Sequence, residues 1–306
     1  MTGRLCGSGV VCYARRRDGH VWLLLGRERE TPGWTQGSRR WSSFSGRVEA
    51  GESALQNAAR EFVEESCAAV ALEEGGRVPV RTSDVERCLA RASVVERGFV
   101  ARGGEAARHV TFVARVPFAD QPAQFARFRG QLMRLDAVFR ALYRARKDCE
   151  AAPRLVFPGF EMSPRLVTQD LELDDVEEPP KLRVTLWSAW GRELVELQPT
   201  APMLPELRRL RDALAVVRCC VAEPEAAAAL AHPAVRVTRV GGVVAHARVD
   251  RAFLEKSELR WFEAVELEQA RAEGRLADDF RRCFLEAMPD VLGRIADAER
   301  GDAAAV

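Results

Sequence analysis

Several glutamates lie close together in one short stretch of the sequence, GRVEAGESALQNAAREFVEESCA, which runs from Gly46 to Ala68. Glu61, Glu64 and Glu65 are spaced three and four residues apart, so they share one face if this stretch is helical. Like charges placed in this way destabilise a helix slightly. The spacing therefore indicates a face neutralised by a bound cation, and Glu52 lies just behind a glycine-bearing turn nearby.

The chemistry follows from the ligand type. Carboxylate oxygens are hard ligands that select Mg²⁺ or Mn²⁺, and Mg²⁺ joins a few carboxylates to substrate phosphates. A metal held in this way stabilises developing charge and lowers the pKa of an attacking water, which favours hydrolysis of a phosphoanhydride. Arg60 precedes the cluster directly. It either pairs with Glu64 one turn later or orients a carboxylate that binds the metal.

A helix with a defined start is expected to present this face. Ser53 and Gln56 match the S/T-x-x-E/Q capping box, which satisfies orphan N–H groups at a helix N-terminus. Apolar residues fall on the opposite face, where they form a side that can be buried: Leu55, Ala58, Ala59 and Phe62. Gly46 and Gly51 are expected to let the backbone turn tightly before the helix.

The stretch resembles the Nudix box, written G-x5-E-x7-R-E-U-x-E-E-x-G-U, in which U is a bulky apolar residue. The matching positions are Gly46, Glu52, Arg60, Glu61, Phe62, Glu64 and Glu65. The sequence departs from the box at its end, where Cys67 replaces the expected glycine and Ala68 replaces the bulky residue. That glycine serves packing and chain turning in the family.

The resemblance implies a Mg²⁺-dependent (or Mn²⁺-dependent) hydrolase that cleaves a nucleoside diphosphate linked to another group. It implies that Glu61, Glu64 and Glu65 bind the metal, that Glu52 assists and that Arg60 orients. Gly46 and Glu52 are candidates for contact with the bound metal and nucleotide.

A further acid from a late loop often serves as base or extra ligand in the Nudix family. The sequence offers Glu255 and Glu258 in E-x-x-E-x-x-W-F, and we favour Glu258. Exposed charges beside an edge strand explain both residues equally well.

The fold implied by the resemblance is an α/β/α sandwich with a mixed sheet, enlarged by a mostly helical middle insertion. We expect a Nudix core at residues 1–118 and 252–306, and an insertion at 119–251. Apolar runs predict core strands near 10–14, 21–26, 89–102, 109–116 and 259–262, followed by a terminal helix or helix pair. In the insertion, patterns predict helices at 124–149, 204–219 and 223–231, strands at 181–190 and 235–249, and an exposed acidic loop at 170–180.

The predicted helix 124–149 is the main clue to the substrate. Its arginines could track an RNA backbone, which would make the chain similar to the Nudix decapping enzymes, some of which, in large DNA viruses, carry extra helical segments. The alternative, which we favour, is that its Phe/Leu stripe packs on a core and leaves the arginines in solvent. Free nucleotides, nucleotide sugars, dinucleoside polyphosphates and inositol pyrophosphates are further possible substrates.

Three aromatic residues precede the box: Trp34, Trp41 and Phe44. An aromatic side chain there could stack on a base, and Trp41 is the candidate, although core packing is the more common role of such residues.

The whole chain has 306 residues and a formal net charge of +1, which argues neither for nor against nucleic acid. Its eight cysteines show no zinc spacing and are expected to be reduced thiols. We find no signal peptide or apolar run long enough for a membrane span, so we expect a soluble cytoplasmic protein. A Nudix-fold module that binds a nucleotide or partner without hydrolysis remains the alternative function. The oligomeric state stays open.

Overall fold

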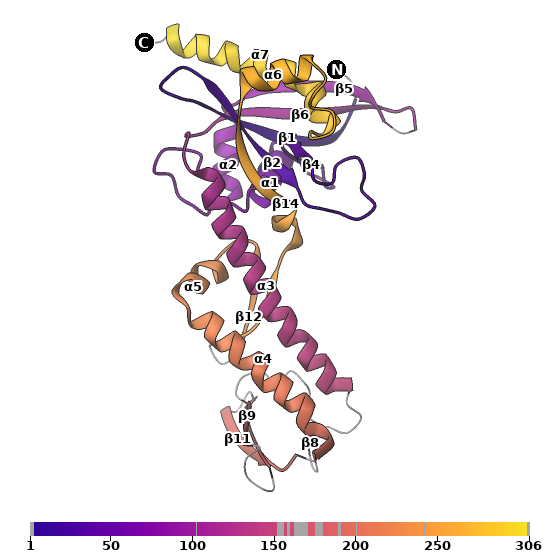
Figure 1. Ribbon diagram of the computed structural model, residues 1–306, viewed down its shortest axis with the longest axis vertical. Coiled ribbons are helices and arrows are strands. Elements are labelled where there is room, and N and C mark those ends of the chain that lie inside the picture. The colour runs from indigo at the N-terminus through magenta and orange to yellow at the C-terminus, as the bar shows by residue number, and fades with distance from the viewer. Residues whose placement is uncertain are drawn as a thin grey trace. The chain divides into compact units, whose positions relative to one another are not determined.

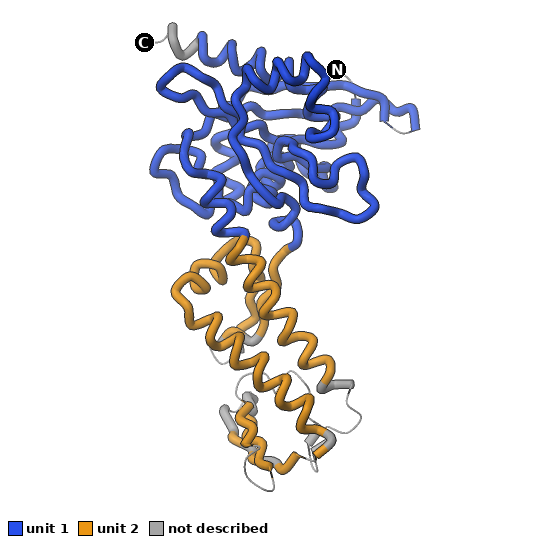
Figure 2. Tube along the Cα trace, viewed as in Figure 1, with its two compact units in different colours: residues 1–129, 251–306 blue, residues 130–250 orange. Residues whose placement is uncertain are grey.

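The computed structural model describes residues 3–101, 103–151, 156–157, 160–161, 171–174, 180–188, 191–199, 201–240 and 243–304. The chain forms two compact units, one made of residues 1–129 and 251–306 and the other of residues 130–250 (Figure 2). The predicted domain boundaries at residues 118 and 252 stay a prediction.

The first unit is built on a mixed sheet (Figure 1). Its strands are β1 (Arg4–Arg15), β2 (Val21–Glu28), β3 (Trp41–Ser42), β4 (Phe44–Arg47), β5 (Ser93–Val100), β6 (Ala106–Arg115) and β14 (Lys256–Glu263). The order is β14-β2-β1-β6-β5, with β3 beside β2 and β4 beside β1. β1 and β6 are parallel, and the other pairs of this sheet are antiparallel.

Helices cover both faces of this sheet. On one face lie α1 (Ala54–Glu65) and α2 (Thr82–Leu89), and on the other lie α6 (Ala264–Ala272) and α7 (Arg282–Ala304). The apolar residues of β1 and β2 are therefore buried on both sides, which explains why the two strands read as continuous apolar runs. The predicted α/β/α sandwich with a mixed sheet is confirmed.

The helix α3 (Gln121–Ala151) begins in the first unit and continues into the second. It buries most of its predicted apolar stripe, Phe125, Leu132, Leu135, Phe139 and Leu142, while Phe128 of the same stripe is half-buried. The second unit also contains α4 (Leu204–Ala222), α5 (Pro224–Leu230) and the strands β7 (Val156–Phe157), β8 (Phe160–Glu161), β9 (Leu171–Asp174), β10 (Lys181–Ser188), β11 (Gly191–Leu197), β12 (Val235–Val240) and β13 (Val243–Val249). The insertion is thus large and helical, and it also carries small sheets.

Two predictions about individual elements are wrong. Residues 171–174 form a strand with Leu171 and Leu173 buried, although this region was expected to be an exposed loop; residues 170 and 175–179 lie outside the described residues. Alternation of apolar and acidic residues outweighs the acidic composition there. The expected strand from Leu89 begins only at Ser93, because Leu89 closes α2 and is buried there.

None of the described helices is long and apolar enough to span a membrane.

Candidate active site

The helix α1 begins as its sequence predicts. The Gln56 N–H donates to Ser53 Oγ at 3.2 Å, and the Ser53 N–H donates to Gln56 Oε1 at 3.0 Å, so the capping box is closed. Gly51 has φ +86°, a left-handed conformation that suits glycine in the turn before the helix. Local sequence therefore sets the position from which the box glutamates project.

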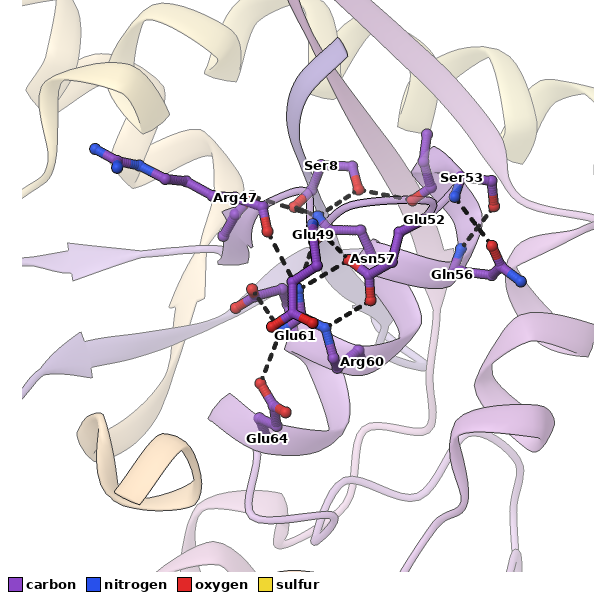
Figure 3. Close-up of polar contacts among 12 residues, drawn as sticks. Ser8, Arg47, Glu49, Glu52, Ser53, Gln56, Asn57, Arg60, Glu61 and Glu64 are labelled. Atoms are coloured by element: carbon purple, nitrogen blue, oxygen red, sulfur yellow. Dashed lines mark hydrogen bonds and ion pairs between the residues drawn. The ribbon is translucent and has the colours of Figure 1, made fainter. Parts of the chain in front are cut away.

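Arg60 is the centre of the acidic cluster. Its Nε lies 2.8 Å from Glu52 Oε1, and its Nη1 lies 2.9 Å from Glu61 Oε1 and 3.0 Å from Glu64 Oε2 (Figure 3). The hydrogen bond to Glu52 is the main reason that the pKa of Arg60 is raised, and the same bond lowers the pKa of Glu52. Both readings of Arg60, as partner of Glu64 and as orienter, agree with these contacts.

Glu61 is packed against the backbone of β4. A Cβ added at Gly46 would lie 2.1 Å from the carboxylate carbon of Glu61, so only glycine leaves room for this side chain. Gly46 is therefore required for close approach, whereas we had expected it to serve a tight turn. Burial raises the pKa of Glu61, which means that the positive charge of Arg60 does not compensate its carboxylate fully.

Glu65 has different partners from Glu61 and Glu64. It is buried, accepts a hydrogen bond from the Ser45 N–H at 2.7 Å and lies 3.1 Å from Lys256 Nζ. Lys256 also contacts Glu28 Oε1 at 2.6 Å and donates to Ser42 Oγ at 2.7 Å. Burial raises the pKa of Glu65, and the nearby ammonium opposes that shift.

Asn57 joins the box to β1, and sequence reasoning missed it. The side chain is fully buried, and its Nδ2 donates to Ser8 Oγ at 2.8 Å, while its Oδ1 accepts from Arg60 Nη2 at 2.7 Å. Ser8 Oγ in turn donates to the Ala54 carbonyl at 2.6 Å. The one signal in the sequence is that Asn57 precedes the small residues of the buried helix face.

The two late glutamates lie in different surroundings. Glu255 is one of the negative charges that raise the pKa of Glu61. Glu258 is 51% exposed at its side chain and lies 3.8 Å from Arg27 Nη1. Of the two, Glu255 is the one whose charge acts on Glu61, whereas we had favoured Glu258. The assignment of either residue as a base stays a prediction.

The three aromatic residues before the box also differ in their surroundings. Trp41 is buried, with its ring centroid 4.9 Å from that of Phe262, and Phe44 packs on Phe62. Trp34 is 37% exposed, and the Arg281 guanidinium lies 5.3 Å above its ring. Trp34 is therefore better placed than Trp41 to meet a ligand.

A cavity of about 950 Å³ adjoins the box at Ser45, Gly46 and Arg47. Arginines dominate its charged lining, with one glutamate among them: Arg40, Arg47, Arg97, Arg281, Arg282 and Glu286. His109 also lines it, and burial lowers the pKa of this imidazole to about 4, with Arg281 and Arg97 adding to the effect. Arg97, Arg281 and Arg282 also lie against carboxylates. The excess of arginines still gives the lining a net positive charge, which attracts anions such as phosphates.

The carboxylates of the box fit a divalent metal in donor type but not in their present arrangement. Within the described ranges, no three His, Cys, Asp or Glu side chains are grouped closely enough to hold a metal as they stand. The donors still fit, since oxygens of Glu61 and Glu64 converge on a single nitrogen of Arg60 and are hard ligands. Glu61 and Glu64 would hold the metal after turning from Arg60.

Cys67 adopts a conformation that favours the glycine of the box. Its φ is +51°, as is that of Ala68, and both residues are fully buried. The Cys67 thiol donates to the Phe253 carbonyl with a sulfur–oxygen distance of 2.8 Å, and burial raises its pKa to about 12. The chain therefore turns here as the box requires, and the cysteine side chain adds a contact to the segment η2 (Arg251–Leu254).

No protein-family model matches the chain, and no curated protein matches it. Among solved structures, a Nudix hydrolase from M. smegmatis, RenU, is 19% identical with a TM-score of 0.26, over 39% of this chain and 65% of that one. A C. elegans Ap4A hydrolase is 20% identical with a TM-score of 0.23, over 36% of this chain and 64% of that one.

A third structure is the bifunctional NMN adenylyltransferase/ADP ribose pyrophosphatase of Francisella tularensis, complexed with AMP and an Mn ion. It is 18% identical with a TM-score of 0.23, over 38% of this chain and 28% of that one. This chain spans less than two-thirds of the length of all three, and scores this low carry no argument of their own. In its box, and in the α/β/α core that presents the box, the chain resembles the Nudix superfamily.

Proposed function

We propose that the chain is a divalent-metal-dependent pyrophosphohydrolase that acts on a nucleotide-type substrate. The observation that carries this proposal is the position of Gly46, which contacts Glu61 on one side and lines the arginine-rich cavity on the other. A diphosphate held at the box would therefore extend directly into a cavity suited to anions. When bound, Mg²⁺ or Mn²⁺ supplies charge neutralisation and a more acidic water.

The chain's own residues have separate tasks in this proposal. Glu61, Glu64 and Glu65 are the proposed metal ligands. Arg60 would release Glu61 and Glu64 to the metal while it stays paired with Glu52, and Asn57 anchors Arg60 to β1. Trp34 offers a partly exposed ring on which a base can stack, backed by Arg281. Glu255 or Glu258 would serve as a late acid.

The proposed substrate is either capped RNA or a free nucleotide derivative. Three arginines of α3 already have partners: Arg129 donates to the Lys256 carbonyl, Arg134 pairs with Glu223 and Arg140 pairs with Asp136. Arginines engaged in this way, on a helix whose apolar stripe is buried, favour the free nucleotide derivative.

The deciding experiment is Mg²⁺-dependent hydrolysis of cap-labelled RNA, free cap nucleotide, nucleoside triphosphates, ADP-ribose and an inositol pyrophosphate. We expect turnover of at least one substrate, lowered by about 100-fold or more in Glu64→Gln, because a catalytic metal loses a ligand. Preference for capped RNA over the free cap would assign an RNA-binding role to α3. A Glu64→Gln variant with normal turnover would refute the metal assignment.

A module that binds without hydrolysis is the second candidate. The observation that favours it is that Arg60 and Lys256 already form ion pairs with the box glutamates. Absence of turnover on the whole panel with both Mg²⁺ and Mn²⁺, in a chain that still binds nucleotide, would support this alternative.

A further inference from the structure

Arg281 is held at the wall of the cavity by three different contacts. Its backbone N–H donates to the Trp41 carbonyl at 2.9 Å, its Nη1 lies 3.1 Å from Glu28 Oε1, and its guanidinium lies 5.3 Å above the ring of Trp34. Trp34 is itself fixed, because a Cβ added at Gly37 would lie only 2.1 Å from its indole ring. A guanidinium held in this way loses little further freedom when it binds a ligand.

The guanidinium of Arg281 has donors to spare. It carries five N–H groups, and among the described residues only one of them, on Nη1, donates to a side chain, that of Glu28. The Arg281 side chain is 26% exposed and lines the cavity, so the remaining N–H groups are open to a ligand there. Phosphate oxygens accept two parallel hydrogen bonds from such a planar fork.

A second arginine and a histidine lie on the same wall of the cavity. Arg97 of β5 is the register partner of His109 of β6, so the two side chains share one face of the sheet, and both line the cavity with Arg281. Thr111 Oγ1 lies 3.4 Å from His109 Nδ1, and no hydrogen bond of His109 Nε2 is found within the described part of the chain. The imidazole therefore has one nitrogen left for a ligand.

The charges around His109 favour an anion. Burial, and then the positive charges of Arg281 and Arg97, lower the pKa of His109 to about 4, so its imidazole is neutral near pH 7. Asp290 and Glu286 lie 3.8 Å and 3.9 Å from Arg97, but about half of each carboxylate side chain is exposed, and such pairs are weak. Both charges that act on the imidazole are thus positive, which suits an anion in front of it.

Gly7 joins this wall to the box. A Cβ added at Gly7 would lie 2.8 Å from the Gly46 carbonyl oxygen and 3.0 Å from His109 Cδ2, so both groups pack against the Gly7 backbone. Gly46 in turn contacts Glu61, and it lines the cavity. One substrate can therefore occupy the box and the wall at His109 together.

We propose that Arg97, His109 and Arg281 form a subsite for a phosphate group of the substrate, separate from the carboxylate face of α1 and independent of a divalent metal. The proposal rests on the proposed function in taking the ligand to be part of the substrate. Both guanidinium groups donate to the phosphate oxygens, and the neutral imidazole adds one hydrogen bond without adding a charge. The phosphate is either part of the diphosphate at the box or a further phosphate of the nucleotide.

The test is binding of inorganic pyrophosphate to the full chain in EDTA, measured by calorimetry, with the His109 imidazole signal followed by NMR near neutral pH. His109→Gln assigns this signal among the four histidines. We expect pyrophosphate to shift the signal, and we expect Arg281→Gln and Arg97→Gln each to lower the affinity by about tenfold or more, because each loses charge-assisted hydrogen bonds. Arg275→Gln, which removes the same charge from a residue outside the cavity, should change the affinity by less than about threefold.

Three results would overturn the proposal. The first is pyrophosphate binding that requires Mg²⁺, which would assign the anion to the carboxylate face alone. The second is an unchanged His109 signal, and the third is wild-type affinity in the folded Arg281→Gln and Arg97→Gln proteins. Arg281→Gln is expected to fold, because Lys256 still pairs with Glu28 at 2.6 Å, and Arg97→Gln tests the subsite from another strand.

Turnover identifies which phosphate occupies the subsite. A loss of kcat/KM in Arg281→Gln on nucleoside triphosphates that spares ADP-ribose would assign a third phosphate to the subsite, and an equal loss on both would assign a phosphate of the diphosphate. No loss on either would count against the proposal. Absence of turnover on every substrate, with pyrophosphate still bound in EDTA, would refute the proposed function while the anion subsite stood.

Discussion

Replacing Gly46 with alanine should affect catalysis at the box far more than the stability of the fold. The added methyl carbon would lie 2.1 Å from the Glu61 carboxylate carbon and 2.1 Å and 2.3 Å from its two oxygens. Non-bonded heavy atoms prefer separations of about 3.5 Å, so the carboxylate must move by about 1 Å or more. This displacement breaks the present position of Glu61 relative to Arg60 and Glu64.

Gly46→Ala is expected to lower the turnover rate. A misplacement of about 1 Å in a catalytic group can reduce the rate by about 100-fold, equivalent to about 2.7 kcal/mol of transition-state stabilisation. The group that must move is the free end of a flexible side chain, so the change in free energy of unfolding should be about 1 kcal/mol or less. Gly46→Ala should therefore be folded and nearly inactive.

The assay is kcat/KM on the best substrate of the panel, measured beside urea unfolding of the same preparation. Gly130→Ala is the matched control, because an added Cβ at Gly130 meets no atom within 4 Å. If Gly46→Ala retained more than about one-third of wild-type kcat/KM, the reasoning from close approach to catalysis would be refuted. A large loss of stability would instead show that the backbone of β4 cannot tolerate the methyl group.

Three further predictions concern the residues around the box. Cys67→Gly should change the free energy of unfolding in urea by about 1 kcal/mol or less, because glycine adopts the left-handed backbone without strain and this gain offsets the lost thiol contact. Cys67→Val should lower the free energy of unfolding by about 2 kcal/mol or more. Equal effects of the two substitutions would contradict this reasoning. The pKa of His109 is about 4 in the fold and near 6.5 when unfolded, so its protonation favours the unfolded chain. Stability should fall as the pH drops below about 6.5, and less steeply in His109→Gln than in the wild type; identical slopes in urea titrations would be the contrary result. Trp34→Ala should raise KM for a nucleotide substrate with little change in the free energy of unfolding. Trp41→Ala should lower the free energy of unfolding by about 3–5 kcal/mol, since Trp41 is the buried one of the two. The reverse pattern would indicate that Trp41 stacks on the base.

Predictions based on neighbouring residues succeeded most fully. The start of α1 depends on Ser53 and Gln56, which contact each other within one turn, and the spacing of Glu61 and Glu64 follows from helical geometry alone. The two apolar runs near residues 10–14 and 21–26 likewise predict strands, which the structure contains as the antiparallel pair β1 and β2. Each of these features involves residues close together in the chain, so pattern and propensity suffice to predict them.

Predictions that required distant partners succeeded less well. Trp41 and Trp34 are seven residues apart in similar composition, and only packing against distant elements, including β14, α6 and α7, encloses Trp41. Glu255 raises the pKa of Glu61, whereas the half-exposed Glu258 lies 3.8 Å from Arg27. Neither difference has a local signature, since side-chain burial depends on which elements meet.

The sequence by itself determined that a Nudix-like acidic helix exists, where it begins and which glutamates share it. Only the tertiary structure decided that these glutamates separate into two clusters with different counter-ions. Lys256 comes from β14, 191 residues after Glu65, and it reaches Glu65 only because β14 pairs with β2. Helical spacing predicts that carboxylates meet one another, but the cation that compensates them depends on contacts between distant parts of the chain.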